Sequence, residues 1–572
     1  MRYPMRTQLT AALALCAALG GTQAFAQSPK MPIVKLADRA AAASPSGVGY
    51  WSDYTGHDEA SPSDGRAMAI ESMPYGETAG ADVYVSQNAR GPQEIATPDV
   101  TTSIPGPEPF FLDTPPANTA QPKPAGKPAA DAKKLAEQVA GAYKDPFYLN
   151  DFSYLDNPAY NDWHLGEELK RMPLGCGYLD LGGSYRLRYH NEHNIRGLGL
   201  TGRDDQFLLD QTRVYSNWRI NDDVRVFAEF LDAGSSYENF APRGIEVNQF
   251  DMQNLFADFR LLDSADGSLT VRGGRQELLF GSQRLVSPLA WANTRRTFDG
   301  ARFTYDNQDG VVVDGFWTRP VRVFDRDEDS PDLDQQFFGF YASNKNFDYS
   351  QLDSYYLGFL DSFGDQKVHT FGNRLSGEAD GVLWDFEGAY QYNEQPTDPE
   401  GRSDGFAVAG LGRELGGDWN PVLWGYYDWA SGSETTGEGF NQLFPLGHKY
   451  LGFMDLFGRR NINDANALLT FKPAKRFSTL LWYHYLFLAE PEAGPYNVTG
   501  SPFNPGGTTA SRDLGHEIDV LGTFAITPRS ELLLGYSHFF SGDYYDQSVD
   551  AAGAPLFDGD GDFYYVQWLQ LF

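Results

Sequence analysis

The sequence predicts an all-β protein: a transmembrane antiparallel β-barrel of about 18 strands, preceded by a mostly disordered N-terminal extension. Polar and apolar residues alternate along strand-length segments from residue 179 to the end of the chain. Short and long connections alternate between these segments, as they do in outer-membrane barrels. The chain also begins with a secretory signal and ends on an aromatic strand.

Composition agrees with a barrel and excludes a bundle of membrane helices. Mean hydropathy is -0.45, and the one long apolar run lies at the N-terminus. Barrel strands average to such low values because only alternate residues face lipid. The 15% of aromatic residues and the 60 glycines are compatible with this fold. We expect outer-membrane lipid and lipopolysaccharide around the protein, and no nucleic acid as a partner.

Residues 1–26 have the pattern of a signal peptide. Arg2 and Arg6 form its charged region, "LTAALALCAALGG" its apolar region, and "AFA" at 24–26 its cleavage site. We therefore expect export, with Gln27 as the first residue of the mature chain. A lipoprotein signal at Cys16 is the weaker alternative, because Leu15 stands where a small residue is required.

Two segments separate the signal from the barrel. Residues 27–140 are rich in alanine and proline and lack apolar periodicity, which predicts a mostly disordered periplasmic segment with a short helix over 129–142. Such a segment has the length to meet a periplasmic export partner or peptidoglycan. Residues 141–178 are too aromatic for a linker, so we expect a cap or plug that packs under or into the barrel.

Residues 179–572 form the predicted barrel. In "DLGGSYRLRYH", Leu181 and Tyr185 lie on one face, while Arg186 and Arg188 lie on the other. Strands are expected to begin near residues 179, 212, 224, 253, 268, 300, 311, 335, 353, 367, 382, 404, 421, 463, 477, 514, 530 and 562. The last of them, "DFYYVQWLQLF", carries aromatic residues on one face and ends on Phe572, which is typical of outer-membrane barrels.

The connections define two ends of the barrel. Those at 221–223, 307–310, 379–381 and 527–529 are short, whereas those at 190–210, 232–252, 431–462, 489–513 and 541–561 are long. The alternation weakens around 344–352 and 362–366. Long connections lie outside the cell and short ones in the periplasm in barrels of this kind. We expect the long ones to be extracellular loops.

A barrel of about eighteen strands leaves an aqueous lumen whose charges select the solute. The polar faces of the first six strands carry Asp180, Glu229 and Asp258, together with eight arginines. These are Arg186, Arg188, Arg213, Arg219, Arg225, Arg260, Arg272 and Arg302. The later strands lean acidic. A guanidinium presents a planar fork that fits a carboxylate or phosphate, so the basic wall favours an anionic cargo.

Bracing of the wall is the alternative for any single arginine. Arg225 could pair with Glu229, and Arg374 with Glu378. Acidic runs also occur at 326–334 and 557–563, in the expected extracellular loops. Carboxylates there are candidate ligands for Ca²⁺, although solvated charge is the stronger interpretation.

The stretch "RGGRQELLFGSQRLVSPLAWANTRRTFDGARF" (272–303) resembles the bacterial alginate export family of outer-membrane barrels. The matching residues are Gly274, Arg275, Gln276, Gly281, Arg284, Leu285, Arg296, Thr297, Phe298, Asp299 and Gly300. The likeness extends over about 145–572. It implies an eighteen-stranded barrel with an arginine-rich constriction for uronate polysaccharide. It further implies that Arg275, Arg284 and Arg296 lie at the pore or constriction, with Asp299 as an arginine partner.

We therefore expect a channel that passes an anionic polysaccharide or oligosaccharide, such as an alginate-like uronate polymer, by passive diffusion. A general or small-anion diffusion porin is the alternative, since opposed basic and acidic walls also fit one. An outer-membrane barrel enzyme is less favoured. "GLGLTG" at 197–202 lacks the strand and helix that a dinucleotide site requires, and spacing ties no serine or aspartate to His190 or His484. We expect no catalytic residues, no cofactor and no metal site in the wall.

Overall fold

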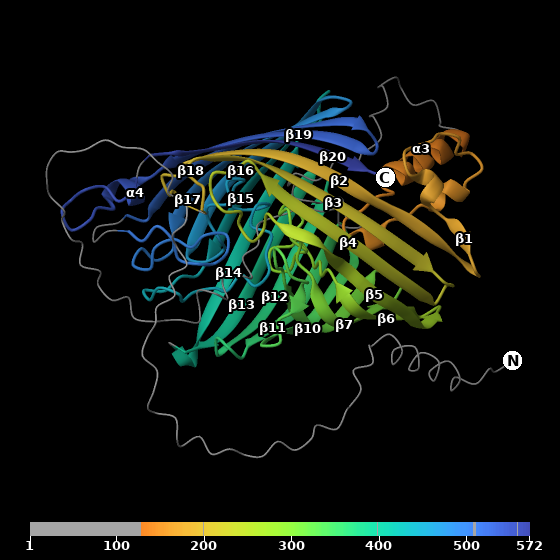
Figure 1. Ribbon diagram of the computed structural model, residues 1–572, viewed down its shortest axis with the longest axis horizontal. Helices are drawn as coiled ribbons and strands as arrows, with labels where there is room; N and C mark the ends of the chain where they lie inside the picture. Colours follow the sequence, from red (N-terminus) through yellow and green to blue (C-terminus); the bar gives the residue numbers. More distant parts are fainter. Residues whose placement is uncertain (1–126, 198, 397, 507–510, 558) are drawn as a thin grey trace, which may run out of the picture. The chain divides into compact units, whose positions relative to one another are not determined.

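The chain folds into a closed barrel. A computed structural model describes residues 127–197, 199–396, 398–506, 511–557 and 559–572 (Figure 1). The predicted signal peptide and residues 27–126 lie outside the described residues. Neighbouring strands pair antiparallel along the sequence, and the first long strand pairs with the last, from Ser184 opposite Leu571 to His193 opposite Asp562. The sheet thus closes on itself, which confirms the predicted fold class.

Among the described residues, eighteen strands form the barrel wall. They are β2 (Gly177–His193), β3 (Asp205–Arg219), β4 (Val224–Ser236), β5 (Asn248–Ser264), β6 (Gly267–Gln276), β7 (Phe298–Asp306), β8 (Val311–Arg322), β10 (Gln335–Phe347), β11 (Ser350–Asp361), β12 (Gln366–Ala379), β13 (Val382–Gln395), β14 (Asp398–Glu414), β15 (Val422–Ala430), β16 (Ile462–Ala474), β17 (Phe477–Leu488), β18 (Asp513–Thr527), β19 (Ser530–Ser541) and β20 (Gly561–Leu571). Two short strands, β1 (Met172–Leu174) and β9 (Ser330–Pro331), pair with β2 and β8.

Most strands begin within about three residues of the predicted position, for example β4 at Val224 and β13 at Val382. Three begin clearly earlier, at Asp205, Asn248 and Asp398. At these ends both faces carry polar residues, so alternation disappears although the backbone ladder continues. The long-loop end is also less uniform than predicted, because β11–β12 and β13–β14 are joined by short connections.

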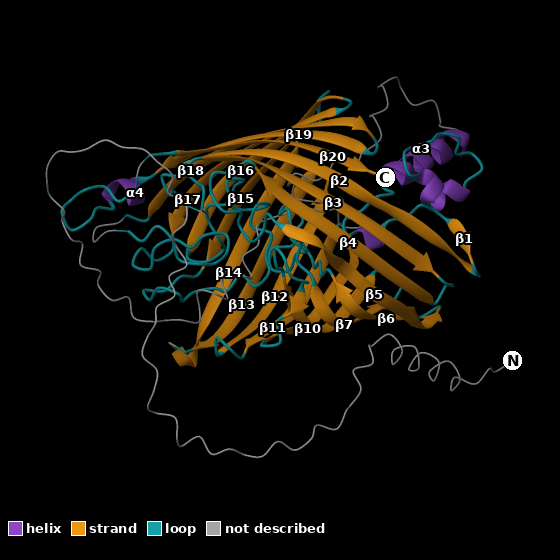
Figure 2. Ribbon diagram, viewed as in Figure 1, coloured by secondary structure: helices purple, strands orange, loops and turns teal. Residues whose placement is uncertain are grey.

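Helical turns lie at both ends of the barrel (Figure 2). Helix α3 (Lys127–Ala140) occupies the position where a short helix was expected over 129–142, and α4 (Asp543–Gln547) lies in the β19–β20 connection. Three short 3₁₀ turns follow α3: η1 (Phe147–Leu149), η2 (Ser153–Asp156) and η3 (Glu167–Leu169). No helix in the described part of the chain has the length and apolar character needed to cross a membrane.

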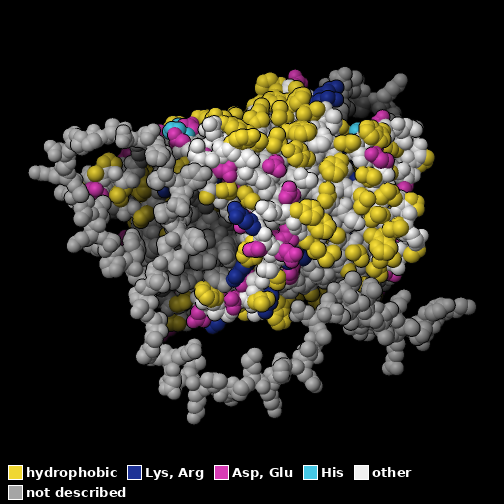
Figure 3. All heavy atoms as spheres, in the orientation of Figure 1, with side chains coloured by type: hydrophobic (Ala, Val, Ile, Leu, Met, Phe, Trp, Pro, Cys, Tyr) yellow, Lys and Arg dark blue, Asp and Glu magenta, His cyan; other side chains and the backbone are white. Residues whose placement is uncertain are grey.

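The outer surface of the barrel is apolar. Trp317 is 66% exposed, Phe340 63% and Leu411 60%, all on the outward face of their strands. Figure 3 shows such hydrophobic side chains gathered over the outside of the barrel on the visible face. Lipid tails are the medium in which large exposed apolar side chains are stable, so the wall has the surface of a membrane barrel.

Candidate pore and constriction

Two long connections fold into the barrel. We name residues 277–297, between β6 and β7, the first inward loop, and residues 431–461, between β15 and β16, the second inward loop. Connections normally lie on the surface, yet most residues of both loops are buried. They also join each other: the Phe444 amide donates to the Leu285 carbonyl (2.9 Å), and the Leu446 amide donates to the Gln283 carbonyl (3.0 Å). The two loops are therefore joined to each other inside the barrel.

Many side chains that face the lumen are buried in this conformation. Side chains that face inward from opposite walls are buried, with Arg188 2% exposed and Asp519 0%. A cavity of ≈ 40 Å³ lies between Arg188, Trp291 and Asp455, which has room for a few water molecules but is far below the roughly 300–1,000 Å³ of a ligand pocket. The inward loops therefore cover part of the wall that the sequence predicts to face water, and the lining of an open pore by these arginines stays a prediction.

The early wall, defined as the lumen face of β2–β7, carries the predicted arginines in ion pairs. Arg213 Nε lies 2.6 Å from Glu229 Oε1. Arg225 and Arg272 share the carboxylate of Asp258, with Arg272 Nε 2.7 Å from Oδ1. On β7, Arg302 Nε lies 2.8 Å from Asp314 Oδ1. These pairs join neighbouring strands and set three carboxylates against four of the eight predicted arginines.

The pairings predicted within single strands are wrong. Arg225 pairs with Asp258 and not with Glu229, while Arg374 lies 2.7 Å from Asp385 and not beside Glu378. Four residues along a strand span about 13 Å. Directly opposed residues on adjacent strands have Cβ atoms only about 5 Å apart, so arginines reach across the sheet and not along it.

Two arginines of β2 hold the first inward loop. Arg186 donates from Nη1 to the Ala290 carbonyl (2.9 Å) and from Nη2 to the Ala292 carbonyl (2.5 Å). The Arg188 guanidinium lies 3.6 Å from the centre of the Trp291 ring. A guanidinium over an indole face is a favourable cation–π contact. These two residues thus bind loop and not solute in this conformation.

Arg219 and Arg260 differ from the other early-wall arginines. Both are half-buried near the short turns, away from the inward loops. Arg260 reaches Asp223 (3.3 Å) and Asp263 (3.0 Å), both of which are exposed. They lie at the rim of the barrel and not at its narrowest part.

The motif residues divide between wall and loop. Arg275 on β6 pairs with Asp299 on β7, Nε to Oδ1, at 2.9 Å. Arg284, in the first inward loop, lies 2.7 Å from both Asp385 and Glu387 on β13. Arg296 donates from Nη1 to the carbonyls of Ser287 (3.3 Å) and Pro445 (3.4 Å), which links the two inward loops.

The late wall, defined as the lumen face of β12–β18, is acidic and is covered by the loops. Arg459 of the second inward loop pairs with Asp428. The Met454 amide donates to Glu517 Oε1 at 2.9 Å. Gly452 (φ +92°) permits this approach, since a Cβ there would lie 2.5 Å from the Glu517 carboxyl. Positively charged or N–H groups of the loop thus meet the carboxylates of the wall.

The N-terminal segment, residues 141–171, covers the lower part of the early wall. Phe147 packs on Tyr215 (centroids 5.2 Å apart) and Tyr148 packs on Phe256 (5.3 Å). Both residues of the segment are 3% exposed. At the short-turn end, Arg529 donates to the Tyr154 hydroxyl (3.1 Å) and so holds the segment beside the last strands.

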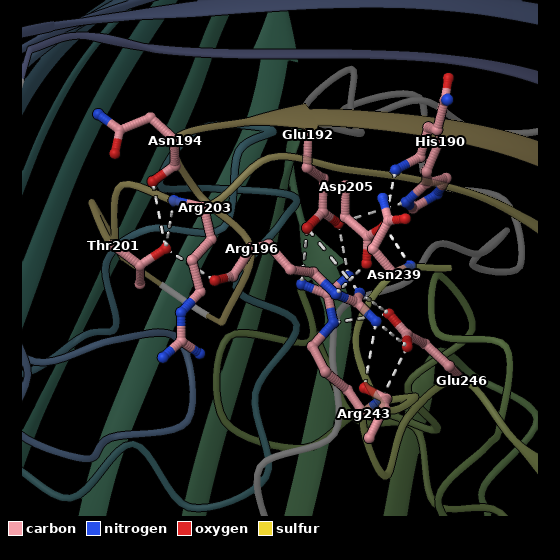
Figure 4. A network of polar contacts seen from close by, with 12 residues as sticks. His190, Glu192, Asn194, Arg196, Thr201, Arg203, Asp205, Asn239, Arg243 and Glu246 are labelled. Atoms are coloured by element: carbon pink, nitrogen blue, oxygen red, sulfur yellow. Dashed lines mark hydrogen bonds and ion pairs between the residues drawn. The ribbon is translucent and has the colours of Figure 1, made fainter. Parts of the chain in front are cut away.

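Sequence reasoning missed several ion pairs in the lumen. At the long-loop end, Arg196 lies 2.7 Å from Glu246, and Arg243 lies 2.6 Å from Glu246 and 2.5 Å from Glu192 (Figure 4). Deeper in the lumen, Arg295 of the first inward loop binds Asp145. Arg295 adjoins Arg296 in the quoted motif stretch, which was a usable signal. No local pattern in the sequence marks Asp145, because its partner Arg295 lies 150 positions away.

The acidic loop at 326–334 makes internal contacts. Asp332 pairs with Arg322 (2.7 Å), and Asp329 accepts from the Asn248 side chain (3.0 Å). Among the described residues, no group of three or more histidine, cysteine, aspartate or glutamate side chains is arranged to hold a metal ion. Ca²⁺ binding at the acidic loops stays a prediction.

Comparison with known proteins gives a family match and distant structural similarity. The family model described as "Alginate export" matches residues 177–557. Among solved structures, OccAB1 of Acinetobacter baumannii shares 12% identity and a TM-score of 0.48, over 71% of this chain and 99% of that one. OccD3 (OpdP) of Pseudomonas aeruginosa shares 12% identity and a TM-score of 0.47, over 71% and 93%. No curated protein sequence matches the chain.

Proposed function

This chain belongs to the alginate export family and is an outer-membrane channel, and from that premise we propose that its cargo is an anionic polysaccharide or oligosaccharide. An alginate-like uronate polymer would pass by passive diffusion along the early wall. The family and the fold are those of channels and not of enzymes. We further propose that the N-terminal extension lies in the periplasm, where an export partner or peptidoglycan is within its reach.

The observation that carries the cargo proposal is the convergence of arginines on one side of the lumen. Arg186, Arg188, Arg213, Arg225 and Arg272 all point inward from β2–β6, and their present partners are carboxylates, carbonyls and rings. A uronate unit offers the same groups, namely a carboxylate and a ring with a flat apolar face. Guanidinium forks recognise carboxylates at low desolvation cost compared with ammonium groups.

A general or small-anion porin is the second candidate. The late wall carries buried carboxylates opposite the arginines, such as Asp464, Glu517 and Asp519. Opposed charges across a lumen orient many small solutes without selecting a polymer. This arrangement would give a channel with weak ion preference.

Recordings of single-channel conductance in planar bilayers test the cargo. We expect preference for anions and block by oligouronate, but no block by a neutral oligosaccharide of equal length. Arg272→Gln should weaken oligouronate block about tenfold, since one charge-assisted fork is lost. Arg413→Gln, on the exposed face of β14, is the matched control and should leave block unchanged. A channel with little selectivity and no oligouronate block would establish the general porin instead.

A further inference from the structure

We propose that residues 145–148 of the N-terminal segment are a pseudosubstrate, which occupies on the early wall a binding site for a carboxylated sugar ring. This inference rests on the proposed function. It adds a binding site on the early wall and a segment of the chain that competes with the cargo for that site. Cargo and segment would exclude each other from the wall. Displacement of the segment would then accompany passage of the polymer.

The site has an aromatic floor. Tyr215, Phe227 and Phe256 project into the lumen from β3, β4 and β5, and their rings stack in a row with centroids 5.8 Å and 5.3 Å apart. Aromatic faces bind the apolar faces of flat ligands in such rows. In this conformation the Phe147 ring packs tilted against Tyr215, and the Tyr148 ring packs edge to face against Phe227 and Phe256. A segment of the chain thus fills a surface that suits a ring.

The same site has an arginine edge, in which Arg213 also pairs with Glu229 and Arg295 also pairs with Glu277. Asp145 accepts from Arg295 at 2.7 and 2.8 Å, a bidentate pair, and lies 3.5 Å from Arg213. Two arginines from different parts of the chain therefore converge on one carboxylate. Paired forks of this kind are the arrangement that recognises a carboxylate ligand.

The remaining contacts place arginines against the rings and backbone of the segment. The Arg213 guanidinium lies 4.0 Å from the Phe147 ring centre, and that of Arg272 lies 4.3 Å from the Tyr148 ring centre. Arg225 Nη1 donates to the Tyr148 carbonyl at 2.8 Å. Within residues 145–148, a carboxylate, two rings and a carbonyl thus all contact arginines. A uronate unit carries a carboxylate, a ring and hydroxyl acceptors at similarly short separation.

The segment can leave without breaking the barrel. Its described secondary structure consists of the 3₁₀ turns η1, η2 and η3, and its first strand contact with the wall is β1, which begins at Met172. Side-chain hydrogen bonds hold residues 141–171, whereas the wall is held by continuous ladders. Withdrawal therefore costs side-chain contacts only.

Two substitutions test whether the segment closes the wall. Asp145→Asn keeps the shape and removes the charge, and Tyr148→Ala removes a ring from the floor. Both should raise the open population of the channel in KCl about tenfold or more, because Asp145→Asn weakens a partly buried ion pair and Tyr148→Ala removes a buried ring of the docked state. Asp162→Asn and Trp163→Ala change exposed residues of the same segment and should behave as wild type. Conductance unchanged in both test variants would overturn the proposal.

Hydrogen exchange tests whether cargo and segment share the site. Oligouronate should accelerate amide exchange over residues 143–152 of the full-length channel in lipid, and a neutral oligosaccharide should not. Oligouronate block without faster exchange would overturn the pseudosubstrate proposal and leave the proposed function intact. Absence of block and of faster exchange, with Asp145→Asn still opening the channel to KCl, would overturn both the shared site and the polysaccharide cargo.

Discussion

The early wall and the late wall of the lumen are covered in opposite ways. Over the early wall, the N-terminal segment contributes the carboxylate of Asp145 to Arg213. Over the late wall, the inward loops contribute Arg284 to Asp385 and Arg459 to Asp428. In these contacts each wall is met by a group of opposite charge from a loop or from the N-terminal segment, and not by the other wall.

The net charge of -32 gives no information on these local arrangements of charge. The charge of a wall and the charge of its cover cancel locally, so neither is visible in composition. The segments that cover the two walls also differ in how they are connected to the strands. The late wall is covered by loops tethered at both ends to strands, whereas the early wall is covered in part by a terminal segment tethered to the wall at one end. The early wall is therefore the easier one to expose.

The largest effect is expected where the late wall loses its cover. Arg284→Met leaves the buried carboxylates of Asp385 and Glu387 with fewer partners, and we expect the free energy of unfolding to fall by about 3–5 kcal/mol. Urea unfolding of the protein in lipid vesicles measures it. Arg326→Met, at a side chain 82% exposed, should change the free energy by less than about 0.5 kcal/mol. Equal losses in the two variants would mean that Arg284 does not anchor the late-wall cover.

An intermediate effect is expected from pH on the early-wall cover. Burial lowers the pKa of Lys170, whose ammonium lies over the Phe152 ring, to about 8. A lysine with a lowered pKa contributes stability above its unfolded pKa of 10.5, and this is lost as pH falls through about 8. The N-terminal segment should therefore be less firmly docked at pH 7 than at pH 10.

Hydrogen exchange over residues 141–171, corrected for the intrinsic rate at each pH, measures this dependence. Lys170→Met removes the titrating group and should make docking independent of pH across the same range. A wild-type segment that is equally protected at both pH values would show that Lys170 does not govern its docking.

The smallest effect is expected at the rim of the early wall. Arg260 pairs only with exposed carboxylates, Asp223 and Asp263. Exposed pairs contribute about 0–1 kcal/mol, so Arg260→Gln should leave stability and anion preference nearly unchanged. Reversal-potential measurements in a salt gradient provide the comparison with Arg272→Gln. If Arg260→Gln reduced anion preference more than Arg272→Gln, the rim and not the inner wall would select ions.

The fold was predictable because its physical signals are local. The alternation of Arg186 and Arg188 with Tyr185 and Leu187 marks a strand with one face toward lipid, and the positions of β4 and β13 follow from such patterns. The first residues of β3 and β14 were not predictable, since polar residues there lie on both faces of the strand and hide the alternation.

The arrangement of the lumen was only partly predictable. Inward-facing arginines follow from strand alternation, and Asp299 beside Arg275 follows from the family motif. The pairs of Arg295 with Asp145 and of Arg284 with Asp385 join residues 150 and 101 positions apart. Such contacts depend on how loops enter the barrel, which no local pattern records.

Closure of the sheet has a consequence for how the protein is made. The seam between β2 and β20 brings together Arg188 and Gln567, whose side chains bond at 2.9 Å across 379 positions of sequence. Contacts so distant in sequence form slowly, because the entropy of the intervening chain must be lost first. The pairing of β2 with β20 is therefore expected to form last. The inward loops would by then already lie inside the curved sheet. In the biogenesis of this channel, the barrel would then close around inward loops that are already in place.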